Sequence, residues 1–272
     1  MPETSLVFVG IAPHPPVMVP EVGRAMAREV SASVEAMRVL TERVRASGAE
    51  TLVLVSPHAP LEARAFVAYA DESLRGDFAN FRAPQATVDF PLDKELLDAV
   101  SASAAREQYA VVELFDHELD HGTAVPLYFL KQNGWRGSVV ALGYSFLSDD
   151  AHLGFGRCVA RAIDQVGRPA AFIASGDLSH RLKPDAPAGF HPDAHLFDEQ
   201  VLEAIRARLP RRIADIDQNL RRLAGECGYR SMLVALGVAG EGGADCEILR
   251  YEAPFGVGYL VAQLALHRRS VN

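Results

Sequence analysis

Short apolar segments with the character of strands alternate along this chain with longer segments in which apolar residues recur at helical spacing. The expected strands are at 5–12, 51–56, 63–70, 137–144, 170–175, 246–252 and 256–264. The expected helices are at 20–47, 93–107, 122–132, 149–166, 193–208 and 228–240. This alternation is typical of an α/β fold. We therefore expect one domain over residues 1–272, with a mostly parallel or mixed central sheet covered by helices on both faces.

The apolar segments also predict positions within the sheet. Residues 51–56 (TLVLVS) and 170–175 (AAFIAS) are apolar almost throughout, which is typical of central strands buried on both faces. Residues 246–252 (CEILRYE) alternate between apolar and polar side chains, which places this strand nearer an edge. The proline-containing stretch 181–195 predicts a loop, and we consider it a candidate lid.

Charge and cysteine content exclude several classes of partner. The formal net charge is -8, and the only basic cluster, at 208–213, is short, so we expect no nucleic acid partner. We expect no membrane association, because no apolar run approaches the length of a spanning helix and no signal-like segment begins the chain. The three cysteines lack CxxC spacing, which favours a reducing, cytoplasmic location.

Three histidines follow three of the expected strands. His14 and His58 each lie in a Pro-His-x-Pro sequence, and His180 ends the sequence SGDLSH. A single histidine of this kind is usually a hydrogen-bonded core or capping residue. Ligands gather beyond the carboxyl ends of parallel strands, however, and the flanking prolines restrict the backbone. The three histidines together therefore predict a site at one edge of the sheet, with rigid imidazoles suited to a metal.

Two further positions have both a structural and a functional interpretation. His121, in ELDHGTAVPL, precedes an expected helix and is either a cap or a site residue, and the same choice applies to His117. Glu226, in AGECGYRS, precedes another helix, where a carboxylate interacts favourably with the helix dipole. Glu226 could also supply the carboxylate ligand that would complete a metal site with two histidines.

The sequences APHPP, SPHAP, LDHGTAVPL, SGDLSHRL and AGECGYRS, in this order and spacing, resemble the class III extradiol ring-cleavage dioxygenases of the LigB-like catalytic-subunit type. The resemblance covers nearly the whole chain. It implies a non-haem Fe(II) bound by His14, His58 and Glu226, with His180 as acid/base and His121 as a second active-site histidine. It also implies a small aromatic, catechol-type substrate, O2 as co-substrate, and assembly as a homodimer or with a small second subunit.

The implied ligand set agrees with general metal chemistry. Two imidazoles and one carboxylate on one face of Fe(II) leave open positions at which a substrate and O2 can bind side by side. An imidazole has an ordinary pKa of about 6.5, so near neutral pH the side chain of His180 can accept a phenolic proton and later return it.

Two features depart from the ring-cleaving pattern. Asp177 and the pair Cys227-Gly228 resemble the Memo branch of the superfamily, in which a cysteine contributes to the metal site. Neighbouring side chains on a helix point about 100° apart, so Glu226 and Cys227 cannot easily bind the same ion. Our interpretation takes Glu226 as the third ligand and keeps Cys227 as the alternative, since a carboxylate suits Fe(II) and a thiolate suits Zn or Cu(I). Asp177 either accepts the Nδ1 proton of a ligating histidine or caps its own turn.

The sequence thus leaves three hypotheses in order of preference. The first is an Fe(II)-dependent extradiol dioxygenase. The second is a Memo-like metal-binding or redox protein without ring cleavage, and the third is a Zn-dependent hydrolase. A nucleotide-binding protein is not favoured, because no GxGxxG or GxxxxGK[ST] motif follows a strand.

Overall fold

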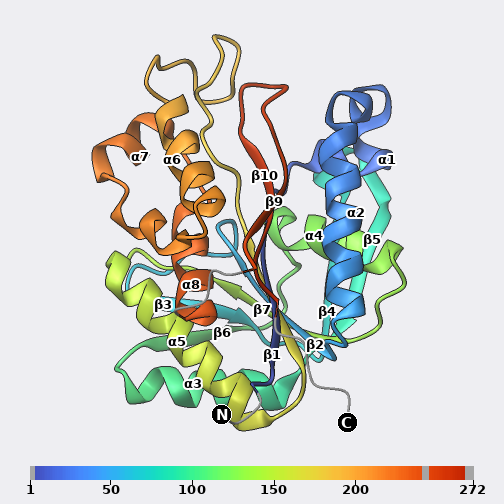
Figure 1. The fold of residues 1–272 in the computed structure, drawn as a ribbon. Helices are drawn as coiled ribbons and strands as arrows, with labels where there is room; N and C mark the ends of the chain where they lie inside the picture. Colours follow the sequence, from blue (N-terminus) through green and yellow to red (C-terminus); the bar gives the residue numbers. More distant parts are fainter. Residues whose placement is uncertain (1–3, 241–244, 267–272) are drawn as a thin grey trace.

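The fold is built on a central sheet, seen nearly edge-on in Figure 1. The computed structural model describes residues 4–240 and 245–266. Within these residues the sheet has eight strands in the order β6-β3-β7-β2-β8-β1-β10-β9. Their bounds are β1 Leu6–Ala12, β2 Thr51–Ser56, β3 Ala65–Tyr69, β6 Ala110–Leu114, β7 Ser138–Gly143, β8 Ala170–Ser175, β9 Glu247–Glu252 and β10 Tyr259–Leu266.

The sheet is mixed, with a parallel centre. Strands β7, β2, β8 and β1 are neighbours and run parallel, whereas β3 pairs antiparallel with β7, and β10 pairs antiparallel with both β1 and β9. The predicted α/β class is confirmed, as are the central places of β2 and β8 and the edge place of β9. Because the central strands are parallel, the loops that follow β1, β2, β7 and β8 leave the same edge of the sheet.

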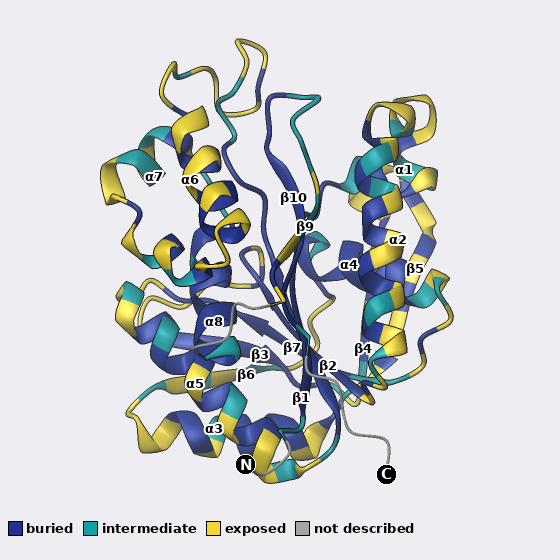
Figure 2. Cartoon of the chain, viewed as in Figure 1, coloured by how far each residue is buried: buried dark blue, intermediate teal, exposed yellow. Residues whose placement is uncertain are grey.

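Each face of the sheet has its own apolar core, and buried residues run through the centre of the molecule in Figure 2. One face packs against α3 Lys94–Arg106, α5 Asp149–Val166, α6 His195–Arg206 and α8 Tyr229–Ala239. The other packs against α2 Ser31–Ala46, α4 His121–Gln132 and a hairpin formed by β4 Ser73–Phe78 and β5 Ala83–Pro91. The central strands are therefore buried on both sides, as their apolar sequences predict.

Several elements differ from the prediction. The helix expected at 20–47 is three elements, α1 Pro20–Gly23, the 3-10 helix η2 Arg24–Val30 and α2, because Arg24 has a positive φ of 49° that breaks the helix.

The β4–β5 hairpin, β6 and the short helix α7 Gln218–Ala224 were not predicted. The hairpin is half exposed and interrupted by Gly76 and Pro84, and β6 is short and lies at the sheet edge, so their apolar signals are weak. The remaining short elements are the 3-10 helices η1 Pro16–Met18, η3 Ala79–Phe81 and η4 Pro210–Asp215.

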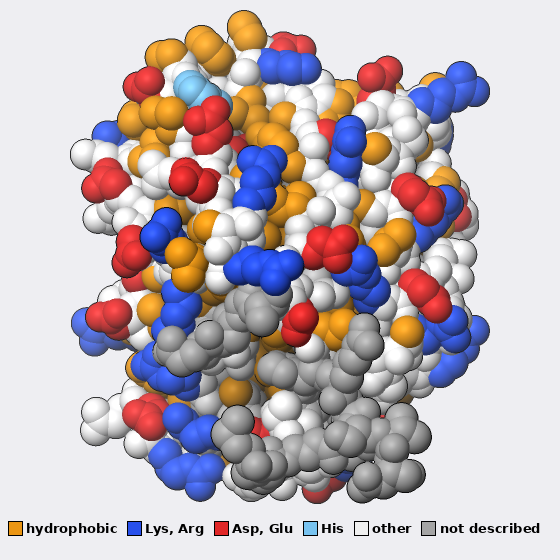
Figure 3. All heavy atoms as spheres, in the orientation of Figure 1, with side chains coloured by type: hydrophobic (Ala, Val, Ile, Leu, Met, Phe, Trp, Pro, Cys, Tyr) orange, Lys and Arg blue, Asp and Glu red, His pale blue; other side chains and the backbone are white. Residues whose placement is uncertain are grey.

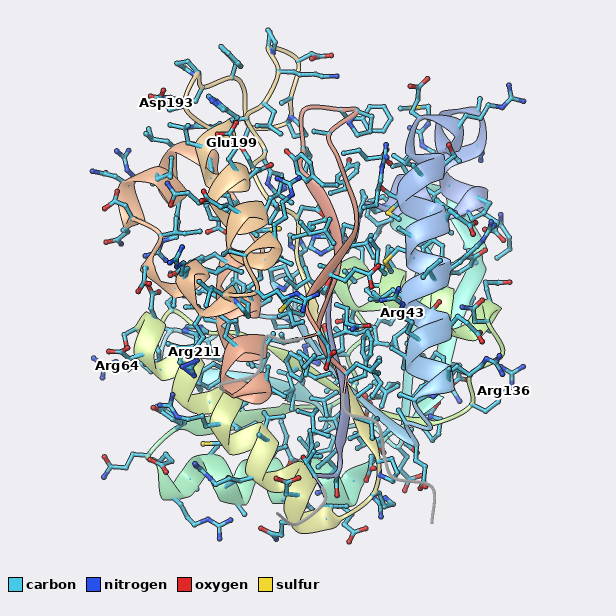
Figure 4. All side chains as sticks on the ribbon, viewed as in Figure 1. Arg43, Arg64, Arg136, Asp193, Glu199 and Arg211 are labelled. Carbon is cyan, nitrogen blue, oxygen red and sulfur yellow. The ribbon has the colours of Figure 1, made fainter. Side chains whose placement is uncertain are left out.

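The segment between β8 and α6 is a loop, as predicted, and it rises above the sheet in Figure 4 beside the labelled Asp193 and Glu199. Its first turn is anchored, because the buried carboxylate of Asp198 accepts a hydrogen bond from the Ser179 amide at 2.9 Å. The turn also packs backbone to backbone: a Cβ on Gly176 would lie 2.2 Å from the Cα of Gly228. This approach holds the start of α8 against the loop that follows β8.

The surface carries charges of both signs. On the face shown in Figure 3, Lys and Arg side chains stand beside Asp and Glu across most of the area. Arg43 on α2, labelled in Figure 4, is an example, since it pairs with Glu247 of β9 at 2.7 Å. No helix in the described ranges combines the length and the apolar character needed to cross a bilayer.

Candidate metal centre

Three histidines from separate segments converge at the carboxyl edge of the sheet. His14 follows β1, His58 follows β2, and His121 is the first residue of α4. Their ligating atoms all lie within 4.8 Å of one another. The ring of His121 stacks on that of His58 with centroids 4.3 Å apart, and the ring of His14 meets both edge-on. The structure therefore brings together three of the histidines that the sequence singles out.

The hydrogen bonds of His14 determine which of its nitrogens faces the other rings. The hydroxyl of Ser175 donates to the carbonyl of Gly122 at 2.5 Å, so its oxygen can accept from Nδ1–H of His14, 2.9 Å away. The Nε2 atom of His14 then carries a lone pair, and it lies 3.1 Å from Nε2 of His58. Burial lowers the pKa of His14 well below its usual value. Positive charge on the rings of His58, His121 and His180 lowers this pKa further.

The other two converging imidazoles are also held in the neutral form. Desolvation is the main cause that lowers the pKa of both His58 and His121, while the carboxylate of Asp120 opposes the shift. The pKa of His58 falls to about 4, with charge on His121 as the second cause. Neutral imidazoles are the form that binds metal ions.

Asp177 supports His14 through the backbone rather than through the ring. Its Oδ1 accepts the backbone amide of His14 at 3.1 Å, and its Oδ2 lies 3.8 Å from the Nε2 atom. Of the two roles that the sequence leaves open for Asp177, acceptance of an Nδ1 proton does not apply to His14, because the Nδ1 atom of His14 is bonded to Ser175. Burial raises the pKa of Asp177 to about 7, against the hydrogen bond from His14.

Asp120 links the segments that carry His58 and His121, and sequence reasoning missed it. Its carboxylate accepts four hydrogen bonds, from Ser56 Oγ (2.5 Å), Tyr69 Oη (3.0 Å), Thr123 N (3.1 Å) and Thr123 Oγ1 (2.9 Å). Ser56 in turn accepts the backbone amide of His58 at 3.1 Å. One carboxylate therefore caps α4 at its first residues and fixes the turn after β2. The sequence feature that could have predicted this capping role is the aspartate immediately before the expected helix, in DHGT.

Glu226 and Cys227 are adjacent, and their side chains are engaged in different places. The sulfur of Cys227 lies 3.7 Å from Nε2 of His14 and accepts the amide of Asp177 at 3.4 Å. The carboxylate of Glu226 accepts the amide of Tyr229 at 2.6 Å and so caps the first turn of α8. Burial raises the pKa of Glu226 to about 7 and that of the Cys227 thiol well above its usual value.

Glu226 also lines a cavity of about 710 Å³, which we call the α7–α8 cavity. Its walls come from α7, the start of α8 and the residues between them: Asp217, Gln218, Asn219, Arg221, Arg222, Gly225, Glu226, Tyr229 and Arg230. None of the clustered histidines is among them.

His180 lies near the cluster, because its charge is among those that lower the pKa of His14. Its Nδ1 lies 2.9 Å from the carbonyl of Leu178, which can only accept, so Nδ1 carries the proton and Nε2 the lone pair. Burial lowers the pKa of His180, and charge on His58 lowers it further. His117 is different: its ring is exposed and its Nδ1 donates to the carbonyl of Phe115 at 2.7 Å, so it is a loop residue outside the cluster.

The spacing of His14 and His58 fits a single metal ion. Two nitrogens bonded to one ion at about 2.1 Å lie roughly 3.0 to 3.4 Å apart, and a nitrogen and a thiolate sulfur roughly 3.1 to 3.6 Å apart. The Nε2 atoms of His14 and His58 are 3.1 Å apart, within the first range. The sulfur of Cys227, 3.7 Å from His14 Nε2, lies just beyond the second range and outside the group formed by His14, His58 and His121. Neutral imidazoles beside a thiol form a donor set suited to a transition metal rather than to Mg²⁺ or Ca²⁺.

The chain thus has an α/β fold whose mixed sheet carries, at its carboxyl edge, three histidines that could hold a metal ion. The family described as "Catalytic LigB subunit of aromatic ring-opening dioxygenase" matches residues 9–262. The chain belongs to this family, which confirms the resemblance seen in its motifs.

Two individual relatives are similar to this chain over different shares of its length. The chain is 34% identical over 264 residues to protein CA_C1420 of Clostridium acetobutylicum, covering 93% of this chain and 56% of that protein. It is 25% identical over 171 residues to MEMO1 family protein MTH_45 of Methanothermobacter thermautotrophicus, covering 61% and 58%. The chain therefore spans little more than half the length of these relatives.

Among solved structures, the fold is similar to that of uncharacterized protein JW3007 from Escherichia coli K12, with a TM-score of 0.61 and 19% sequence identity. The match covers 84% of this chain and 92% of that one. At this identity the likeness concerns the fold.

We expect Asp120→Asn to weaken metal binding by roughly 10- to 100-fold, because asparagine keeps one oxygen and turns an amide donor toward groups that themselves donate. Competition with a chromophoric chelator measures the affinity, and circular dichroism checks the fold. Asp77→Asn is the control, since Asp77 also accepts a backbone amide, that of Ala79, but caps an exposed 3-10 helix. Unchanged affinity in folded Asp120→Asn would exclude this positioning role.

Proposed function

We propose that this protein is a Memo-like, metal-dependent oxidoreductase of the LigB family, whose ion is bound by His14, His58 and Cys227. We further propose that it acts on a small aromatic substrate with O2, in the cytoplasm, where Cys227 stays reduced. A small-molecule substrate agrees with the family to which the chain belongs.

The observation that carries this proposal is the division between Cys227 and Glu226. The thiol lies 3.7 Å from the metal-facing nitrogen of His14, whereas the carboxylate is committed to the amide of Tyr229. The third ligand that we propose is therefore Cys227, the alternative that the sequence left open, in place of Glu226. The similarity to a MEMO1 family protein agrees with the resemblance of Asp177 and Cys227-Gly228 to the Memo branch, which implies a cysteine at the metal site.

The surrounding residues have separate tasks in this proposal. An iron or copper ion bound by the histidines and the thiolate would supply a site for O2 and for electron transfer. His180 accepts or returns a substrate proton at Nε2, because its Nδ1 proton is fixed on Leu178. His121 donates a hydrogen bond to the substrate from its place against His58. Ser175 and Asp177 hold His14 in place.

Extradiol ring cleavage with Fe(II) is a second candidate, and a specific observation favours it. His180 lies near enough to His14 and His58 for their charges to interact, and its Nδ1–H is directed to the Leu178 carbonyl, which leaves Nε2 as the nitrogen that can accept a catechol proton. The family description supports the same chemistry. With a thiolate in place of a carboxylate, however, the ligand set departs from the facial triad of two histidines and one carboxylate.

The ligand assignment predicts opposite results for two adjacent substitutions. Cys227→Ser should weaken Co(II) binding by more than roughly tenfold and abolish the thiolate-to-cobalt charge-transfer band, because it removes the sulfur ligand. Glu226→Gln should keep both the Co(II) affinity and the charge-transfer band. Anaerobic Co(II) titration followed by absorption measures this, with Cys246→Ser as a control for a buried thiol outside the site. The reverse pattern would assign Glu226 as the ligand and favour Fe(II) ring-cleavage chemistry.

The pH dependence of metal affinity distinguishes the same ligands without a substitution. Burial raises the pKa of Cys227 above its usual value, so binding as a thiolate releases one proton, and the logarithm of affinity should rise by about one per pH unit between about pH 7.5 and 9. The histidines contribute nothing there, because their pKa values are lowered. If Glu226, with a pKa of about 7, were the ligand, the rise would end near that pH. Zn(II) competition titrations across this pH range distinguish Cys227 from Glu226 as the ligand.

His180 provides the test of ring cleavage. If the Fe(II)-loaded protein opens a catechol ring, His180→Gln should keep iron and bind the catechol but turn it over roughly 100-fold more slowly, since only proton transfer is lost. Stopped-flow mixing with a catechol panel and O2 measures both steps, and His117→Gln is the control. A wild-type protein that binds iron but cleaves no catechol would eliminate this second candidate and leave the first.

A further inference from the structure

The peptide group between Leu178 and Ser179 joins a buried carboxylate to the imidazole of His180. Its N–H, from Ser179, donates to Oδ1 of Asp198 at 2.9 Å, and its C=O, from Leu178, accepts from Nδ1–H of His180 at 2.9 Å. A peptide group is planar and trans, so its N–H and C=O point in opposite directions. Asp198, on α6, and the ring of His180 therefore lie at the two ends of one hydrogen-bonded chain.

The carboxylate of Asp198 is a buried, ionised group at neutral pH. Only 1% of the residue is exposed, and its Oδ2 accepts the hydroxyl of Tyr251, on β9, at 2.7 Å. Burial raises the pKa of Asp198 to about 6, against the hydrogen bonds from Tyr251 and Ser179. A Cβ on Gly258 would lie 2.2 Å from Oδ2, so the backbone closes this side of the carboxylate. The negative charge therefore acts on two neutral donors at close range.

The peptide group in the middle of the chain cannot turn away from either partner. The amide of Leu178 donates to the carbonyl of Gly258 at 2.8 Å, and the amide of Gly258 donates to the carbonyl of Ser179 at 2.8 Å. The amide of His180 donates to the carbonyl of Ala224 at 2.9 Å. Backbone hydrogen bonds on both sides thus fix the plane through which Asp198 and His180 are connected.

The charge at one end of this chain affects the bond at the other end. Hydrogen bonds to an ionised group are roughly twice as strong as neutral ones, and hydrogen bonds in a chain polarise one another. A carboxylate at the N–H end increases the negative charge on the oxygen at the C=O end. The Leu178 carbonyl is then a stronger acceptor for the Nδ1 proton of His180. The hydrogen bond at one ring nitrogen sets the protonation of the other.

We propose that Asp198 is a positioning residue for His180, which acts through the Leu178–Ser179 peptide to keep the imidazole proton on Nδ1. The inference rests on the proposed function, in which Nε2 of His180 accepts the substrate proton, but the hydrogen-bonded chain itself needs no metal.

The test is NMR of the EDTA-treated, metal-free protein with 15N-labelled histidine at about pH 7.5, where Asp198 is ionised. Asp198→Asn keeps an oxygen for the Ser179 amide but removes the charge. The Nδ1 proton of His180 should then exchange with water roughly threefold faster or more, and the Nε2–H tautomer should increase, because the chain loses its ionised acceptor. Thermal unfolding checks that the variant is folded.

Two controls separate charge from packing. Tyr251→Phe removes a hydrogen bond from the same carboxylate but keeps its charge, so His180 should behave as in the wild type. The Nδ1 atom of His117 also bonds to a carbonyl two residues earlier, at 2.7 Å, but on an exposed loop. The signals of His117 should be the same in the wild type and in Asp198→Asn, which makes them an internal reference.

A second measurement applies even if Asp198→Asn does not fold. Lowering the pH of the wild type to about 5 protonates Asp198, because the pH falls through its pKa of about 6, and should cause the same faster exchange at His180. His195 and Glu199 also affect Asp198, and His58 affects His180. The change must therefore persist in His195→Gln and in Glu199→Gln.

The proposal is overturned if folded Asp198→Asn leaves the Nδ1 proton of His180 unchanged, or if Tyr251→Phe has the same effect as Asp198→Asn. In metal-loaded protein that turns over a phenol, Asp198→Asn should lower kcat roughly threefold and leave KM unchanged. Because the NMR measurements contain no metal, the expected change at His180 in a protein that fails to bind Co(II) would sustain the role of Asp198 and reject the proposed function.

Discussion

The parallel alignment of β1, β8 and β2 is the constraint on which the rest of the site depends. Adjacent parallel strands in register deliver their next residues to the same edge, so His14, Ser175 and His58 meet although they are far apart in sequence. The direct hydrogen bond between His14 and Ser175 shows how closely the first two loops are coupled. Everything else that approaches the histidines, including α4 and α8, packs onto this edge.

Two helix starts then complete the site, and each is fixed by a carboxylate. Asp120 accepts hydrogen bonds at the start of α4 and from the end of β2, and Glu226 caps the start of α8. The backbone contact between Gly176 and Gly228 leaves no room for a side chain, which brings Cys227 beside His14. Asp120 and Glu226 therefore act on the position of the backbone, while the imidazoles of His14, His58 and His121 converge, with the Cys227 thiol and the Asp177 carboxylate beside His14.

Much of this arrangement could be predicted from sequence, for identifiable reasons. His14, His58 and His180 follow apolar strands, and the rule that ligands gather at the carboxyl ends of parallel strands groups them without coordinates. The role of Asp120 could not be predicted, because it depends on Tyr69 and Ser56, which reach it from two other strands.

Nor could the sequence decide between Glu226 and Cys227. Periodicity indicates that a helix follows them, but the direction of each side chain depends on the residue at which α8 begins. The β4–β5 hairpin and the break at Arg24 were missed for a related reason, since local backbone geometry and edge exposure leave little trace in hydrophobic patterns.

The adjacency of Glu226 and Cys227 has a consequence for how such a site can evolve. A carboxylate and a thiol stand side by side where the chain enters α8, one engaged in capping and the other facing the histidines. Loss of one residue between Cys227 and α8 would move Glu226 into the place that Cys227 now has, and in the site that we propose a hard oxygen donor would then replace a soft sulfur donor without any change in the histidines. In this fold, a shift of one residue before α8 would therefore change the metal that the proposed site prefers and the chemistry that it performs.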